Sequence, residues 1–426
     1  MKYNLKQNFI AGLLVSFIAL PLCIAISGAS EFPLLAGVIT AIIGGILVSQ
    51  INGSRLAITG PAAGMIVVIF DAVEKLGNGN NFEGYKYTLS AIFIASLMQV
   101  ATSYTKLPDL MRKFPEYIIR GMMIAIGTIV FLKQIFILCG HKAPRVSTLE
   151  FFIHIPKEAF LGAHLESLSL GIFAIFFILI WKKYLEKKYH ICKIIPVYLL
   201  TILGGAILAK ILDIQHHKHF IMKAFSDPLE SSFITISKNI SDTINFPNFS
   251  LIYSFEFWIA TFTIYAVGSL ETILSAIAID KIDPQKNHTN LAKDLRAIGI
   301  GNTICGSIGA LPMIAEIVRS SANISYGATN KFANFFHGIC LLLMVTLLQK
   351  YLNFIPLSIL AGMLIIIAFN MINIKNLIEH FHENKKEFFI ILSIVFFTLY
   401  IDLLAGIACG LFLHFISHNK FRKWQK

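Results

Sequence analysis

The sequence predicts an all-α polytopic membrane protein in which fourteen transmembrane helices form two halves of seven with opposite orientation. Of its 426 residues, 56% are hydrophobic and only 14% are charged, whereas a soluble domain carries roughly 25% charged residues. The apolar runs are long and numerous, and two of them, at 55–70 and 312–326, carry a Gly-Pro or Leu-Pro step near their start. These observations indicate a membrane protein with two helices that are interrupted at membrane depth.

The first apolar run follows a short basic N-terminus and extends from Phe9 to about Ala29. It is longer than the ~7–15 apolar residues of a signal peptide, so we expect a transmembrane helix. Most other runs approach the ~20 residues that a bilayer requires. The predicted spans are 9–28, 33–51, 55–70, 88–106, 117–138, 166–183, 192–212, 253–279, 289–309, 312–326, 331–349, 355–371, 386–401 and 402–418.

The distribution of basic residues predicts that both termini are cytoplasmic. With the N-terminus inside, 23 Lys and Arg residues fall in inside loops and tails and 11 fall outside, which with Arg55 and Arg319 make up the 36 of the chain. This asymmetry follows the positive-inside rule and requires an even number of spans. The excess of basic residues in cytoplasmic loops explains the net charge of +12, so no nucleic-acid partner is needed. A basic strip that contacts anionic membrane lipid is a further explanation of this charge.

A repeat relates the two halves. Residues 34–65 and 297–326 each contain a Gly-rich helix, a short break, a proline and then a helix of small residues. Seven spans, an odd number, precede the eighth span. The second half would therefore begin on the opposite side of the membrane and have the opposite orientation. Paired interrupted segments of this kind indicate the binding site of a secondary transporter.

The third predicted span opens with Gly60, Pro61, Ala62 and Ala63. Gly and Pro leave backbone N–H groups unpaired at a helix start, and these groups together with the helix dipole can bind an anion. Tight packing between helices through small residues is the alternative. The matching break at 311–312 in the other half favours the anion site.

Three ionisable side chains are predicted at membrane depth. Glu271 lies near the middle of the eighth span, with Ser275 one turn further on the same face. It is either a coupling-ion site or a structural carboxylate, and the cost of an intramembrane acid favours the former. Glu316 and Arg319 lie one turn apart in the tenth span. A local ion pair is one interpretation, and an oxyanion site at Arg319 is the other.

The charges of these groups predict cation coupling. Two helix N-termini contribute roughly +0.5 each, Arg319 adds one positive charge, and Glu271 and Glu316 subtract two. A monovalent anion would then leave the site negative, and a bound Na+ or H+ would restore the balance. We therefore expect symport of a cation with an anion.

Other polar features indicate no enzyme, cofactor or metal centre. The six cysteines occur singly, which favours buried apolar roles, and no motif of nucleotide, hydrolase or metalloprotease chemistry is present. His216, His217 and His219 lie in a predicted outside loop at 213–252, where a solvated loop is favoured over a metal site. Asn334 and His337 share one face of the eleventh span, where we expect polar contacts between helices.

Several segments together resemble the SulP (sulfate permease) family of inorganic anion transporters, in particular bacterial members that are proposed to carry bicarbonate. They are GLLVSFIALPLCIAISGAS, SRLAITGPAAGM, SLETILSAIAIDKIDP, NLAKDLRAIGIGNTICGSIGALPMIAEIVRSSANI and FIPLSILAGMLI. The chain departs from common family patterns at Leu22, which follows the first helix's proline, and at Glu316. We also expect it to have no C-terminal STAS domain, which many members of the family carry.

The resemblance implies a single transmembrane unit of 1–426, with a core at about 9–106 and 253–349 that moves against a gate at about 110–213 and 355–418. By motif match, it implies an anion site at Pro61, Ala62, Ala63, Met313, Ile314 and Ala315, with Arg319 near the anion. It also implies a cation site at Glu271, Ser275 and Glu316.

We therefore expect a bacterial inner-membrane secondary transporter of a small inorganic oxyanion, bicarbonate first and sulfate second, that works by alternating access with Na+ or H+. An uncoupled channel or exchanger, a nucleobase permease on the same fold and a membrane-embedded sensor subunit are the alternatives. Partners that the resemblance allows are a second copy of the chain and a separate carbonic anhydrase.

Overall fold

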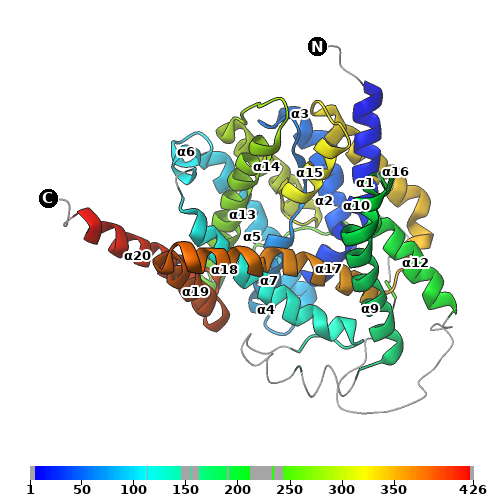
Figure 1. The fold of residues 1–426 in the computed structure, drawn as a ribbon. Coiled ribbons are helices and arrows are strands. Elements are labelled where there is room, and N and C mark those ends of the chain that lie inside the picture. The colour runs from blue at the N-terminus through cyan, green and yellow to red at the C-terminus, as the bar shows by residue number, and fades with distance from the viewer. Residues whose placement is uncertain are drawn as a thin grey trace.

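The fold is that of a computed structural model, which describes residues 5–112, 114–144, 155, 163–189, 191–211, 233–234 and 243–422 (Figure 1). The predicted histidine cluster at 216–219 lies outside these ranges. The described residues are predominantly helical, as the sequence predicts. Six of their helices are long and apolar enough to cross a membrane by length and composition: Leu5–Ala29, Glu116–Leu138, Leu165–Lys188, Phe255–Ile282, Phe332–Gln349 and Leu357–Glu379.

The first half contains the elements that correspond to the first seven predicted spans. They are α1 (Leu5–Ala29), α2 (Ala36–Ile43), the π-helical turn η1 (Gly44–Val48), α3 (Ser49–Ile51), β1 (Ile58–Pro61), the 3-10 turn η2 (Ala63–Met65), α4 (Ile66–Gly77), α5 (Asn81–Thr102), α6 (Leu107–Met111), α7 (Glu116–Leu138), α9 (Leu165–Ile180), the π-helical turn η4 (Trp181–Leu185), α10 (Glu186–Lys188), α11 (Ile191–Ile194) and α12 (Val197–Ile211).

The second half repeats this order after 243. Its elements are α13 (Phe255–Ile282), α14 (Leu291–Ile308), β2 (Met313–Glu316), α15 (Ile317–Ser325), α16 (Phe332–Leu352), α17 (Leu357–Ile372), α18 (Ile374–Glu383), α19 (Lys385–Tyr400) and α20 (Leu403–Arg422).

The helix contacts recur in inverted pairs between the halves. α1 packs on α16 as α13 packs on α5, and α2 and η1 pack on α16 as α14 packs on α5. Likewise α9 packs on α17 as α19 packs on α7, and α12 packs on α9 as α20 packs on α19. Figure 1 shows the first of these pairs, with α1 beside α16. Each contact therefore has a counterpart seven spans away, as an inverted repeat requires.

The two interrupted spans are extended at their starts, and here the predicted helix boundaries are wrong. Residues 58–61 and 313–316 form an antiparallel pair, β1 and β2, in which Gly60 lies opposite Ile314 and Pro61 opposite Met313. The helices begin only at Ile66 and Ile317. Proline has no N–H for a helix interior, and at membrane depth the exposed backbone must find partners inside the protein. Pairing the two breaks with each other supplies those partners.

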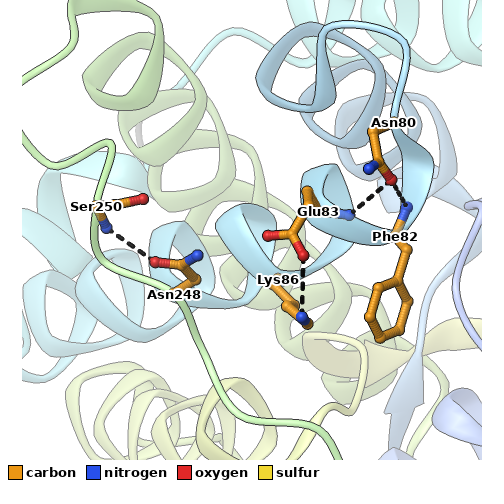
Figure 2. Close-up of polar contacts among 6 residues, drawn as sticks. All are labelled: Asn80, Phe82, Glu83, Lys86, Asn248 and Ser250. Carbon is orange, nitrogen blue, oxygen red and sulfur yellow. Dashed lines mark hydrogen bonds and ion pairs between the residues drawn. The ribbon is translucent and has the colours of Figure 1, made fainter.

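The segment between the third and fourth predicted spans, 71–87, is also mostly helical, because α4 continues to Gly77 and α5 begins at Asn81. The side chain of Asn80 caps α5 by accepting hydrogen bonds from the backbone N–H groups of Phe82 and Glu83 (Figure 2). In the same view, Lys86 pairs with Glu83 at 3.0 Å, and Asn248 accepts from the Ser250 amide. The Asn248 amide donates to the Lys86 carbonyl, so the chain before α13 is fastened to the start of α5.

Candidate functional site

The backbone of β1 is held by side chains from the second half. The Ile58 amide donates to Ser320 Oγ at 2.9 Å, and Asn323 Nδ2 donates to the Leu56 carbonyl at 3.0 Å. Both side chains are buried and belong to α15. α15 therefore replaces the hydrogen bonds that the first half loses where its third span is unwound.

The backbone of β2 is held by Asn302 of α14. The Met313 amide donates to Asn302 Oδ1 at 2.6 Å, and Asn302 Nδ2 donates to the Met313 carbonyl at 3.1 Å. The same Nδ2 donates to Gln99 Oε1 of α5 at 3.1 Å, which fixes the orientation of the amide. Thr40 of α2 donates to the Leu311 carbonyl at 2.7 Å. Asn302 therefore bonds Met313 as a neighbouring strand would.

We expect Asn302→Leu to lower anion transport by about tenfold or more. The substitution leaves the amide and carbonyl of Met313 buried without partners, and each such group costs about 1–3 kcal/mol. A cost of about 1.4 kcal/mol in the transport-competent state corresponds to a tenfold loss. Uptake into liposomes measures the effect, and Ser307→Ala on the same helix is the matched control, because its hydroxyl bonds the Thr303 carbonyl one turn back in α14. Wild-type uptake by Asn302→Leu would contradict a role in shaping the site.

Arg319 lies against the break of the first half. Its side chain is fully buried, and Nη2 donates to the Pro61 carbonyl at 3.1 Å. A Cβ atom added at Gly60 would overlap the guanidinium, so only glycine allows this approach. Nε and Nη1 make no hydrogen bond to an oxygen or nitrogen atom among the described residues, and the Cys23 thiol lies beside the guanidinium. Arg319 therefore brings a positive charge with unused N–H groups to the predicted anion-binding residues, as an oxyanion site needs.

Glu271 lies beside the start of α4. The side chain is 6% exposed, and a Cβ atom added at Gly64 would overlap its carboxylate. Neither carboxylate oxygen has a hydrogen-bond partner within the described part of the chain. Ser275 is buried one turn further along α13. A buried carboxylate without a hydrogen-bonded or ionic partner must be neutralised by a proton or a bound cation.

Glu316 and Arg319 form no ion pair, although both lie within the described residues. Glu316 is the last residue of β2 and precedes the first residue of α15, Ile317. Because Glu316 precedes α15, the two residues do not share a helical face. They make no direct ion pair, although the charge of Arg319 still acts on Glu316. The carboxylate of Glu316 instead lies near the backbone amide of Ala63, at the start of the first-half helix.

The structure gathers the predicted residues of both halves around the strand pair. Gly60 and Pro61 lie in β1, and Ala62 and Ala63 lead into α4. Met313, Ile314 and Ala315 lie in β2 rather than at a helix start, because α15 begins only after them, and all three are buried. The predicted helix N-terminus of the second half is therefore displaced to Ile317.

Sequence reasoning missed Asn302, Gln99 and Thr40. The available signal was Asn302 itself, a polar residue in the glycine-rich stretch of the ninth predicted span. Its partner at 313 could not be inferred from spacing. Among the residues that the structure describes, no group of three or more His, Cys, Asp or Glu side chains could hold a metal ion.

Comparisons with known proteins agree with this architecture. A family model described as the sulfate permease family matches residues 5–394. The putative sulfate transporter YvdB of Bacillus subtilis is 27% identical over 97% of this chain and 74% of its own length. The bicarbonate transporter BicA of Synechocystis is 22% identical over 96% of this chain and 69% of its own length.

Solved structures share the fold. The transmembrane domain of a cyanobacterial bicarbonate transporter BicA superposes with a TM-score of 0.80 at 22% identity, over 96% of this chain and 98% of that chain. The structure of SLC26A9 superposes with a TM-score of 0.80 at 14% identity, over 97% of this chain and 66% of that chain.

Proposed function

The chain belongs to the sulfate permease family, and from that premise we propose that it is a cation-coupled secondary transporter of a small inorganic oxyanion. The family consists of anion transporters, so the protein is an integral membrane transporter and not an enzyme. Bicarbonate is the first proposed substrate and sulfate the second, since the relatives include transporters of both names. The observation that carries the proposal is the unpartnered carboxylate of Glu271 at the strand pair that also receives Arg319.

The electrostatics of this arrangement support coupling. Nε and Nη1 of Arg319 can donate hydrogen bonds to an oxyanion. The start of α4 adds the partial positive charge of a helix N-terminus. Glu271 adds a negative charge that the anion does not neutralise. A Na+ or H+ bound with the anion balances the carboxylate, and the loaded site then crosses the membrane at lower cost than the site with the anion alone.

We propose that the core at about 9–106 and 253–349 moves against the gate at about 110–213 and 355–418. Helix packing supports this division, since α1, α5, α13, α14 and α16 pack mainly on one another and α7, α9, α17 and α19 do the same. Between the groups, Lys133 of α7 lies 3.0 Å from the centroid of the Phe70 ring on α4. That contact must change when the groups move. A homodimer in the bacterial inner membrane with both termini cytoplasmic completes the proposal.

Uptake by the purified protein in liposomes tests the function. Radiolabelled bicarbonate or sulfate is offered with an inward Na+ gradient, with an inward H+ gradient and with neither, at equal membrane potential. We expect accumulation of one of these anions to depend on one of the gradients. Saturable uptake that is indifferent to both would favour an uncoupled exchanger or channel, and uptake of neither anion would contradict the proposed substrate class.

A further inference from the structure

The connection between α9 and α12 carries a group of lysines that the proposed transport site does not use. Residues 181–193 contain five lysines and a single acidic residue, Glu186. The lysines, which we call the lysine cluster, are Lys182, Lys183, Lys187, Lys188 and Lys193, and all but the first are exposed. They lie in η4, α10 and α11. A surface with this excess of positive charge attracts an anionic partner.

The helices on either side of the lysine cluster expose apolar surface. α9 lies in the candidate span Leu165–Lys188, and only 28% of the most apolar stretch of that span is buried, the lowest share among the six candidate spans. The exposed apolar side chains of α9 include Ile172, Phe176, Leu179 and Ile180. Those of α12, which packs on α9, are Leu203, Ile207 and Ile211. In an integral membrane protein, such a surface contacts the hydrocarbon of the bilayer.

The lysine cluster begins where this apolar surface ends. Trp181 directly follows Ile180 at the end of α9, and Tyr184 and Tyr189 are exposed among the lysines. Trp and Tyr side chains are enriched at the boundary between the membrane and water. The lysine cluster therefore lies at the membrane surface, at the level of the lipid headgroups.

Two hydrogen bonds fold the connection back on itself. Trp181 Nε1 donates to the Cys192 carbonyl at 3.1 Å and joins η4 to α11. Lys182 Nζ donates to the hydroxyl of Tyr198 at 3.1 Å and lies 5.0 Å from the centroid of the same ring. Tyr198 is buried in the first turn of α12. Because both ends of the connection are held together, its lysines are presented as one surface, which lowers the entropic cost of binding a ligand.

We propose that the lysine cluster binds the headgroups of anionic phospholipids in the leaflet that it faces. The lysines supply positive charge for the lipid phosphate, and the exposed side chains of α9 and α12 supply an apolar surface for the acyl chains of the same lipid. A soluble anion would use only the lysines, so the continuity of the two surfaces favours a membrane lipid. This site uses none of the residues of the proposed transport site and goes beyond the proposed function.

Thermal unfolding of the purified protein in detergent tests the lipid site without transport. Phosphatidylglycerol, phosphatidylcholine and inorganic phosphate are each added in increasing amounts. We expect phosphatidylglycerol to raise Tm at concentrations at which the other two do not, because a ligand that binds only the folded state stabilises it. An equal rise with phosphatidylcholine would overturn the role of the lysines. An equal rise with inorganic phosphate would indicate a site for soluble anions and would overturn the lipid site.

The triple variant Lys183→Gln, Lys187→Gln, Lys188→Gln removes three of the exposed charges. Each lysine near an anionic membrane surface contributes about fivefold to affinity. We therefore expect the phosphatidylglycerol concentration that gives the half-maximal rise in Tm to increase by about 100-fold. The corresponding triple variant with Arg keeps the charge, and we expect it to respond as the wild type does. A wild-type response of the Gln variant would overturn the site.

Lys281→Gln, Lys286→Gln, Lys293→Gln is the matched control. These three lysines are also exposed and lie between the end of α13 and the start of α14. In the predicted topology they are on the same side of the membrane as the lysine cluster, because two spans separate the two connections. We expect this control to keep the wild-type response to phosphatidylglycerol. If the variant of the lysine cluster instead changed the oligomeric state in size-exclusion chromatography, with its lipid response unchanged, the surface would be an interface with a second copy and the lipid site would be wrong.

Discussion

Glu271→Gln is expected to abolish gradient-driven accumulation of the anion while leaving exchange of anion across the liposome membrane. Gln has the same size and fits the space beside Gly64, but it carries no charge that needs a cation. The remaining charges of the site, including Arg319, then bind the anion alone. A coupling cation binds beside Glu271 by neutralising a buried carboxylate that would otherwise cost several kcal/mol. Once the carboxylate is replaced by an amide, the affinity for this cation should fall by more than about 100-fold.

Two uptake measurements separate these effects. Accumulation under the coupling gradient should fall to the level without a gradient, and exchange of labelled for unlabelled anion at equal concentrations should persist. Glu256→Gln is the matched control, because Glu256 is exposed in the first turn of the same helix. Gradient-dependent accumulation by Glu271→Gln at the wild-type level would exclude Glu271 as the coupling residue.

Arg319→Met is expected to raise the half-saturating anion concentration by about 10- to 100-fold. Hydrogen bonds to a charged group contribute about 1.5–3 kcal/mol each, and tenfold in affinity corresponds to about 1.4 kcal/mol. Met has a similar volume, so the packing around Gly60 is largely kept. Arg319→Lys should show an intermediate loss, because Lys keeps the charge but lacks the planar donor pair that matches an oxyanion.

Anion-dependent thermal stabilisation of the purified protein gives a second measure of this affinity, since a ligand that binds only the folded state raises Tm. Arg296→Gln is the matched control, because Arg296 stacks on Tyr104 at 3.9 Å and its Nε donates to Ser103 Oγ after α5. Unchanged affinity in Arg319→Met would place the anion elsewhere.

Local chemistry explains why much of the site could be predicted. Glu271 and Arg319 stand out because charged side chains are costly at membrane depth, wherever the chain brings them. Gly60 and Pro61 mark a break because proline lacks an N–H group and glycine lacks a side chain. In contrast, the sequence spacing of Glu316 and Arg319 does not produce a direct ion pair among the described residues, because α15 begins only after Glu316.

The sequence by itself determined the membrane-embedded helical fold, the two interrupted spans and the ionisable residues near them, since each depends on the residues of one segment. Only the tertiary structure decided that the breaks pair as β1 and β2, that Asn302 bonds Met313, and that Arg319 reaches Pro61, which is 258 positions away. An unwound segment can satisfy its backbone with any donor or acceptor that the fold brings near. Which donors and acceptors lie near the segment depends on how the two halves of the protein pack together.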